Sequence, residues 1–313
     1  MEETKIVWPA EVEIVEVGPR DGLQNLPDYV PAETKIELIK RLAGAGTKIM
    51  EVTSFVHPKA VPQMADAVKV AEFAVQNADQ LGFKPLALVP NLKGAQTAYA
   101  TGLREVNYVI SVSAAHNKAN INRTIEASLE ELENIIAALP ELKINLSMAT
   151  AFGCPFTGEV PTEDILRLTQ SAIDRGVKTI TLADTIGVAN PVQTLGVIRA
   201  VQQAYPDISI GIHIHDTHGA GLANTLMAMS LGITRVESAV GGLGGCPFAP
   251  GAAGNMATED LNNVLLRMGI RTGIDPVRYQ ESVSFVQEHI QASLLSHLSR
   301  ARSYQEFSFY TNS

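Results

Sequence analysis

The chain has 313 residues, of which 46% are hydrophobic and 18% charged, and a net charge of −9, which together fit one large globular domain or two small ones. The acidic balance and the lack of a Lys/Arg run argue against a nucleic-acid partner, and no apolar run approaches the roughly 20 residues of a membrane span. The acidic N-terminus is unlike a signal peptide, and two cysteines form no disulfide framework, so we expect a cytoplasmic protein.

Short β-branched runs alternate with longer amphipathic stretches along the whole chain. We expect strands at Val12–Val17, Lys48–Thr53, Pro85–Val89, Val106–Ser111, Ile144–Ala149, Lys178–Leu182, Ile208–His215 and Arg235–Val240. Helical patterns between them include Ala32–Ala43, Pro62–Val75, Thr162–Asp174, Pro191–Gln203 and Ala220–Ser230. Strands that alternate with helices predict a parallel sheet, and eight strands are the number that closes a barrel.

The distribution of polar residues decides between a closed barrel and an open, doubly wound sheet. Polar side chains follow nearly every predicted strand, among them Arg20, Asp21, Ser54, Asn91, Ser113, His116, Thr150, Asp184, Thr185, His215 and Asp216. An open sheet concentrates its chemistry at one switch point, whereas a barrel uses the ends of many strands. We therefore predict an α/β fold, a (β/α)₈ TIM barrel over about residues 11–270. It lies within one catalytic domain spanning 1–313, with a helical extension over about 274–306, in which Pro276–His297 forms one or two helices.

Two histidines on the seventh predicted strand form the strongest local motif. His213 and His215 alternate with isoleucines, so both imidazoles point to the same face of the strand. They lie about 7 Å apart along the strand and can bind one ion. Two core histidines held by hydrogen bonds are the alternative.

The loop after the first strand, Glu16–Gly22, presents Arg20 and Asp21 between Gly-Pro and Gly. Taken alone, this pair predicts a loop salt bridge. In a closed barrel, however, the first and seventh strands both neighbour the eighth, so Asp21 can complete the metal site. A mixed oxygen and nitrogen ligand set suits one Mg²⁺ or Mn²⁺ per chain. A facial triad of non-haem iron is the alternative, although it usually occurs on an all-β architecture.

The segment Gly241–Asn255 after the last strand holds six glycines in fifteen residues. Ordering such a segment costs conformational entropy, and its spacing matches neither a dinucleotide fingerprint nor a P-loop. We interpret it as a mobile lid that carries one reactive thiol, Cys246. A tight buried turn with an inert cysteine is the alternative. Cys154 lies in a similar Gly-Cys-Pro-Phe turn after the fifth strand.

Long motifs now point to a family. They are Val17–Asn25, Glu51–Phe55, Val61–Met64, Pro90–Gly94, Gly153–Pro155, Asp184–Gly187, His213–Gly219, Gly242–Pro247, Asn255 and Ala257–Asp260. From Val12 to about Gly273 the chain resembles the 3-hydroxy-3-methylglutaryl-CoA lyase family of metal-dependent barrel enzymes. The Gly-Gly-Cys-Pro loop separates this lyase type from the condensing synthases and oxo-acid aldolases that share the metal core.

The resemblance implies a role for each matching residue. Asp21, His213, His215 and Asn255 would bind the metal, Arg20 would stabilise an enolate and Cys246 would transfer a proton. Glu51, Asp184 and Glu259 would support the site. The implied reaction is a retro-Claisen cleavage of 3-hydroxy-3-methylglutaryl-CoA to acetyl-CoA and acetoacetate, with His213, or a water near it, as the base. We also expect a homo-oligomer, a dimer or larger.

Two departures from the family pattern concern the substrate. The typical segment has a Glu and a Phe in place of Ala115 and His116, and a Tyr where His218 stands. Together with Gln24 and Ser54, His116 and His218 are expected to border the substrate. A different 3-hydroxyacyl-CoA, citramalyl-type or longer-branched, therefore stays an alternative, as does an oxo-acid aldolase or synthase. A barrel that binds metal or CoA without catalysis would lack some of the proposed ligands, and none is missing.

Overall fold

Eight parallel strands form a closed barrel in chain order in the computed structural model, which describes residues 6–245 and 254–301. The strands are β1 (Glu13–Glu16), β2 (Ile49–Ser54), β3 (Lys84–Val89), β4 (Glu105–Ser111), β5 (Lys143–Ala149), β6 (Thr179–Asp184), β7 (Ser209–Ile214) and β8 (Arg235–Ser238). Each lies within two residues of its predicted bounds. The predicted TIM barrel is confirmed.

The barrel closes through the pairing of β1 with β8. Their register runs from Glu13 opposite Arg235 to Glu16 opposite Ser238, and Val17 N–H donates to the Ser238 carbonyl at 2.9 Å just beyond the last pair. On its other side β8 pairs with β7, and His213 lies opposite Glu237. The carboxyl ends of β7, β8 and β1 therefore meet at one sector of the rim.

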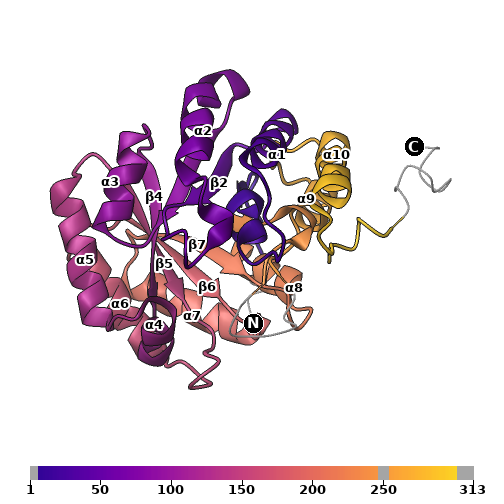
Figure 1. Cartoon of the computed structure of the whole chain (residues 1–313). Coiled ribbons are helices and arrows are strands. Elements are labelled where there is room, and N and C mark those ends of the chain that lie inside the picture. The colour runs from indigo at the N-terminus through magenta and orange to yellow at the C-terminus, as the bar shows by residue number, and fades with distance from the viewer. Residues whose placement is uncertain (1–5, 246–253, 302–313) are drawn as a thin grey trace.

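Helices surround the strands (Figure 1). They are α1 (Ala32–Gly44), α2 (Ala67–Leu81), α3 (Leu92–Ala100), α4 (Ala114–Ile121), α5 (Ile125–Ala138), α6 (Thr162–Ile173), α7 (Pro191–Ala204), α8 (Gly221–Met229), α9 (Thr258–Arg267) and α10 (Pro276–Phe285). Short helical turns are η1 (Gly18–Gly22), η2 (Pro62–Met64), η3 (Val240–Gly242) and η4 (Val286–Ile290). None of the helices in the described parts of the chain has the length and apolar character needed to cross a membrane.

The helix predicted at Pro62–Val75 begins later than expected. Residues 62–64 form only the turn η2, and α2 starts at Ala67. Side chains of this turn make two contacts with earlier parts of the chain. The Gln63 side chain accepts from Val30 N–H at 3.0 Å, and the Asp66 carboxylate accepts from the buried Lys35 ammonium at 2.8 Å.

The C-terminal extension differs from the helices predicted at Pro276–His297. After α10 and η4 the helical geometry stops at Gln291, which has a left-handed φ of 56°. Some of the backbone amides beyond it bond to residues at the barrel rim. Leu295 N–H donates to the Gly241 carbonyl at 3.0 Å, and His297 N–H donates to Asp260 at 2.7 Å. The expected helix over 291–297 is wrong, since this segment is a strap across the rim.

Gly46 marks the contact between this extension and the barrel. Its φ is +100°, and a Cβ there would lie 2.1 Å from the carbonyl oxygen of Gly273. We predict that Gly46→Ala lowers the free energy of unfolding by at least about 2 kcal/mol, because it combines left-handed strain with a backbone clash. Chemical denaturation measures the change.

Gly196 provides the matched control for this substitution. It lies on the exposed face of α7, with nothing within 4 Å of an added Cβ. Gly196→Ala should stabilise by up to about 1 kcal/mol, because it improves helix propensity. Equal effects of the two substitutions would contradict the importance of the contact with Gly273.

Candidate functional site

The rim sector formed by β7, β8 and β1 brings Asp21, His213 and His215 together. Their potential ligand atoms all lie within 4.8 Å of one another, so the three side chains could hold a metal ion. The two imidazole rings share one face, as the strand alternation predicted, with centroids 5.0 Å apart. His215 Nε2 lies 3.8 Å from Asp21 Oδ2. Asp21 and the two histidines, which are far apart in sequence, thus form one cluster.

Asn255 joins this cluster from the chain beyond β8. Its side-chain amide donates to Asp21 Oδ2 at 2.8 Å and to the Leu243 carbonyl at 2.9 Å. Among the described residues, the buried Asn255 Oδ1 and His215 Nδ1 have no hydrogen-bond partner. Buried polar atoms without partners are costly, and a bound cation would satisfy the amide oxygen. The donor set therefore fits a hard divalent metal.

Local structure fixes Asp21 and Arg20 in the turn η1. The N–H groups of Arg20, Asp21 and Gly22 all donate to the Val17 carbonyl, at 3.1, 2.8 and 3.2 Å. The Arg20 side chain, only 8% exposed, donates from Nε to Glu51 and from Nη1 to Asp21. Asn107 in turn donates to the other oxygen of Glu51 at 2.7 Å. Arg20 and Asp21 therefore form the salt bridge expected of this loop, and Asp21 also belongs to the cluster with the two histidines.

Charges around Arg20 and Asp21 determine their protonation. Burial alone would raise the pKa of Asp21, but Arg20, together with His213 and His215, holds it well below its usual value. Burial alone would lower the pKa of Arg20, but the carboxylates of Glu51 and Asp21 raise it. Asp21 is therefore ionised over the working pH range of most enzymes, as a metal ligand must be.

The two histidines have opposite electrostatic environments. Burial, followed by the neighbouring His213, lowers the pKa of His215 to about 4. For His213 burial has the same sign, but its hydrogen bond to Glu237 and the charge of that carboxylate raise the pKa overall. The sequence analysis missed Glu237, whose Oε2 lies 2.9 Å from His213 Nδ1. This contact leaves Nε2 of His213 available for a ligand.

Glu237 could have been found from its position in the sequence. A charged residue in the middle of a β-branched strand is unusual, and Glu237 lies opposite His213 in the parallel register. Glu237 and Glu51 both belong to a polar barrel interior that includes Asn107, Asn145 and Thr181. These hydrogen bonds connect the rim residues to the layers below them.

The three predicted supporting acids make different contacts. Glu51 contacts Arg20 directly. The Asp184 carboxylate accepts from Val188 and Ala189 N–H at 3.1 and 2.9 Å and so holds its own loop. Glu259 accepts from Gly241 N–H at 3.0 Å, and burial raises its pKa to about 7.

The four predicted substrate-binding residues differ in their exposure. Gln24 is half-buried and lines a cavity with Asn25 and Gln63. His218 is exposed, whereas Ser54 and His116 are buried. Their contact with substrate stays a prediction.

The two cysteines differ in what the structure says of them. Cys246 lies outside the described residues. Cys154 is buried, and its thiol lies 3.0 Å from Ser113 Oγ. Burial alone would raise the pKa of Cys154, but its hydrogen bonds, led by the one with Ser113, lower it.

The chain is similar to known proteins over most of its length. The family model described as HMGL-like matches residues 11–286. A hydroxymethylglutaryl-CoA lyase of Bacillus subtilis is 39% identical over 291 residues, covering 92% of this chain and 96% of that protein. The (R)-citramalyl-CoA lyase of Chloroflexus aurantiacus is 41% identical over 273 residues, 84% of this chain and 86% of that protein. The solved structure of an HMG-CoA lyase from Acinetobacter baumannii with coenzyme A and 3-methylmalate has a TM-score of 0.90 and 38% identity. It covers 95% of this chain and 97% of its own.

The buried His116 should make the stability of the fold depend on pH. Its Nδ1 lies 2.7 Å from Ser111 Oγ, and burial lowers its pKa from 6.5 to about 4. Between these values the unfolded chain binds a proton that the folded chain does not, so stability falls as the pH falls from about 6.5 to about 4. Between pH 7 and pH 4.5, the free energy of unfolding of the wild type should therefore fall by about 2 kcal/mol more than that of His116→Gln.

Urea denaturation at several pH values measures this difference. His218→Gln serves as the control, because His218 is exposed, and its curve should run parallel to that of the wild type. A parallel curve for His116→Gln as well would contradict the buried, neutral state of His116.

Proposed function

Because the chain belongs to the HMGL-like family and is a carbon–carbon lyase, we propose that it cleaves 3-hydroxy-3-methylglutaryl-CoA to acetyl-CoA and acetoacetate. The observation that carries the proposal is the cluster of Asp21, His213 and His215 beside Arg20. The B. subtilis relative carries the name of this lyase, and the A. baumannii structure contains coenzyme A. Both support an acyl-CoA substrate.

The proposed cofactor is one Mg²⁺ or Mn²⁺ ion held by Asp21, His213, His215 and Asn255. One carboxylate, two imidazoles and an amide oxygen form a mixed oxygen and nitrogen ligand set of the kind that would suit these ions. When bound, such an ion polarises the substrate's hydroxyl and lowers its pKa. The partnerless Asn255 Oδ1 supports its place in the set.

A water beside His213 is the proposed acceptor of the proton from the substrate's 3-hydroxyl group, because Glu237 occupies Nδ1 of that ring and the metal would occupy Nε2. Glu237 accepts from Nδ1 and so fixes the orientation of the ring. As the hydroxyl proton leaves, the oxygen forms the ketone of acetoacetate and the C2–C3 bond breaks. The electron pair of that bond passes to the thioester as an enolate.

Arg20 is the proposed stabiliser of this enolate. Its guanidinium is held by Glu51 at Nε and Asp21 at Nη1. A guanidinium carries five N–H donors, more than these two contacts use, so it can also donate to a developing oxyanion. A fixed donor of this kind costs no reorganisation during the reaction.

Cys246 is the proposed donor of the proton that converts the enolate to acetyl-CoA. It directly follows Gly245, whose carbonyl accepts from Asn25 Nδ2 at 2.8 Å. Asn25 belongs to the segment after η1, so the start of the Gly-rich segment is tied to the loop that carries Arg20 and Asp21. This contact supports an approach of the thiol to the same site.

We further propose that the chain forms one catalytic domain, a barrel over about 11–270 with an extension over about 274–306. The backbone bond from Asp275 N–H to the Ala45 carbonyl at 2.8 Å supports this, because it joins the extension to the barrel. Two cysteines are too few for a disulfide framework, which supports a cytoplasmic location. A homo-oligomer is proposed from the family resemblance.

An acetyl-CoA release assay tests the function. With Mg²⁺ or Mn²⁺ added, the enzyme should cleave 3-hydroxy-3-methylglutaryl-CoA faster than citramalyl-CoA or a longer-branched 3-hydroxyacyl-CoA. EDTA should abolish turnover. Arg20→Ala should bind Mn²⁺ but lose about 10²–10³-fold in kcat, as expected for a lost oxyanion donor.

Three results of this assay would contradict the proposal. Equal activity of the EDTA-treated and metal-loaded enzymes would exclude metal dependence. Faster cleavage of citramalyl-CoA would reassign the substrate. Full turnover by Arg20→Ala would remove Arg20 from the mechanism.

A further inference from the structure

Glu16, the last residue of β1, is a buried carboxylate to which the proposed chemistry assigns no role. It is 0% exposed, and its two oxygens accept four hydrogen bonds from four segments of the chain. A carboxylate offers about four lone-pair sites, so its accepting capacity is filled. No cation takes part in these four contacts. The arrangement requires an explanation other than an ion pair.

One oxygen of Glu16 holds two loops at the site. Oε1 accepts from Gly18 N–H at 2.8 Å and from Val240 N–H at 2.9 Å. Gly18 begins η1, which carries Asp21, and Val240 begins η3, from which the Gly-rich segment continues. A Cβ on Gly18 would lie 2.6 Å from Oε1 and 2.7 Å from a methyl of Val240. Only glycine permits this close approach.

The two loops meet again at the proposed metal ligands. Leu243 follows η3, and its carbonyl accepts from the side chain of Asn255, which also donates to Asp21 Oδ2. The contacts therefore form a closed circuit from Glu16 through η1 to Asp21, then through Asn255 and Leu243 back to η3. A shift of the Glu16 carboxylate would move both η1 and η3, and with them Asp21 and the Leu243 carbonyl that holds Asn255.

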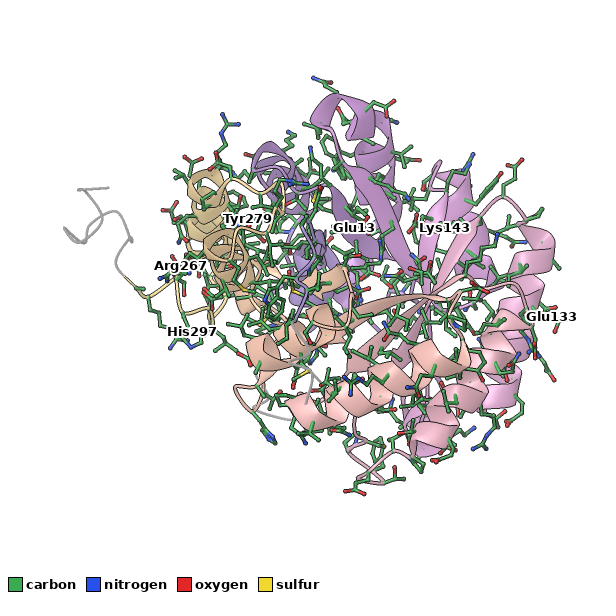
Figure 2. All side chains as sticks on the ribbon, turned by 180° about the vertical axis from the view of Figure 1, so that it is seen from behind. Glu13, Glu133, Lys143, Arg267, Tyr279 and His297 are labelled. Carbon is green, nitrogen blue, oxygen red and sulfur yellow. The ribbon has the colours of Figure 1, made fainter. Side chains whose placement is uncertain are left out.

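The other oxygen of Glu16 is held by the C-terminal helices. Oε2 accepts from Thr258 Oγ1 of α9 at 2.8 Å and from the Tyr279 hydroxyl of α10. Both side chains are fully buried. Figure 2 shows Tyr279 among these helices, on the opposite side of the barrel from Glu133. The helix that follows β8, α9, and the first helix beyond the barrel, α10, therefore fix a carboxylate that in turn fixes the rim.

From this geometry we propose that Glu16 is a positioning residue for the metal site. Tyr279 and Thr258 hold its carboxylate, and the carboxylate sets the separation of Asp21 and Asn255. This inference rests on the proposed metal-dependent function and adds the C-terminal helices to the parts that function requires. Glu16 touches neither metal nor substrate in this scheme.

Tyr279→Phe tests the inference, because it removes one hydroxyl and keeps the buried ring. Tyr108→Phe is the matched control, since Tyr108 on β4 is equally buried and its hydroxyl donates to the Ser128 carbonyl of α5 at 3.0 Å. The melting temperature, the Mn²⁺ affinity without substrate and the kcat and KM of the metal-loaded enzyme are measured for both variants.

The two substitutions should destabilise the fold to a similar degree. Tyr279→Phe alone should weaken Mn²⁺ binding by on the order of tenfold, the range seen when partners of metal ligands are removed, and should lower kcat more than it raises KM. Unchanged Mn²⁺ affinity in Tyr279→Phe, or an equal loss in Tyr108→Phe, overturns the inference.

Thr258→Val gives a second test at the same oxygen if Tyr279→Phe fails to fold. It should also weaken Mn²⁺ binding, and an unchanged affinity overturns the inference. The substrate-free readout separates this inference from the proposed function. A wild type that binds Mn²⁺ but cleaves no acyl-CoA contradicts the function, while the loss of Mn²⁺ affinity in Tyr279→Phe still supports the positioning role.

Discussion

The pairing of β1 with β8 is the constraint on which the whole site depends. Asp21 is far from the two histidines in sequence, and only a closed sheet places the end of β1 within one strand of β7. An open sheet of the same strands would leave β1 and β8 as separate edges. Because the register aligns Glu16 with Ser238, the turn η1 begins level with the chain that leads to Asn255.

Closure also forces charged groups into a buried layer, and those beside the metal cluster pair with an opposite charge. Arg20 is paired with Glu51 and Asp21, and His213 is paired with Glu237. Unpaired buried charges would be costly, so these pairs permit a polar barrel interior. They also prepare the site, because Asp21 is kept ionised and the two imidazoles acquire pKa shifts of opposite sign. The same contacts thus serve stability and the proposed chemistry.

Sequence patterns predicted those features that depend on local periodicity. The alternation in β7 placed both imidazoles on one face, and β-branched runs located all eight strands. The pattern failed where distant contacts override local preference. A charge within β8 marks Glu237 as unusual in the sequence, but its partner His213 is revealed by the strand register. Tyr279 is recognisable only through its hydrogen bond to Glu16. The strap after Ile290 bonds to Gly241 rather than to its own turn, so no helical signal could reveal it.

The central claim is that Asp21, His213 and His215 hold one divalent ion. Electron spin echo spectroscopy of the Mn²⁺-loaded protein tests this most directly, because it detects nitrogen bonded to the metal. Our account predicts one tightly bound ion per chain, with nitrogen coupling from two imidazoles that falls to one in His215→Gln. A bound ion without nitrogen coupling, or a spectrum unchanged in His215→Gln, would contradict the account.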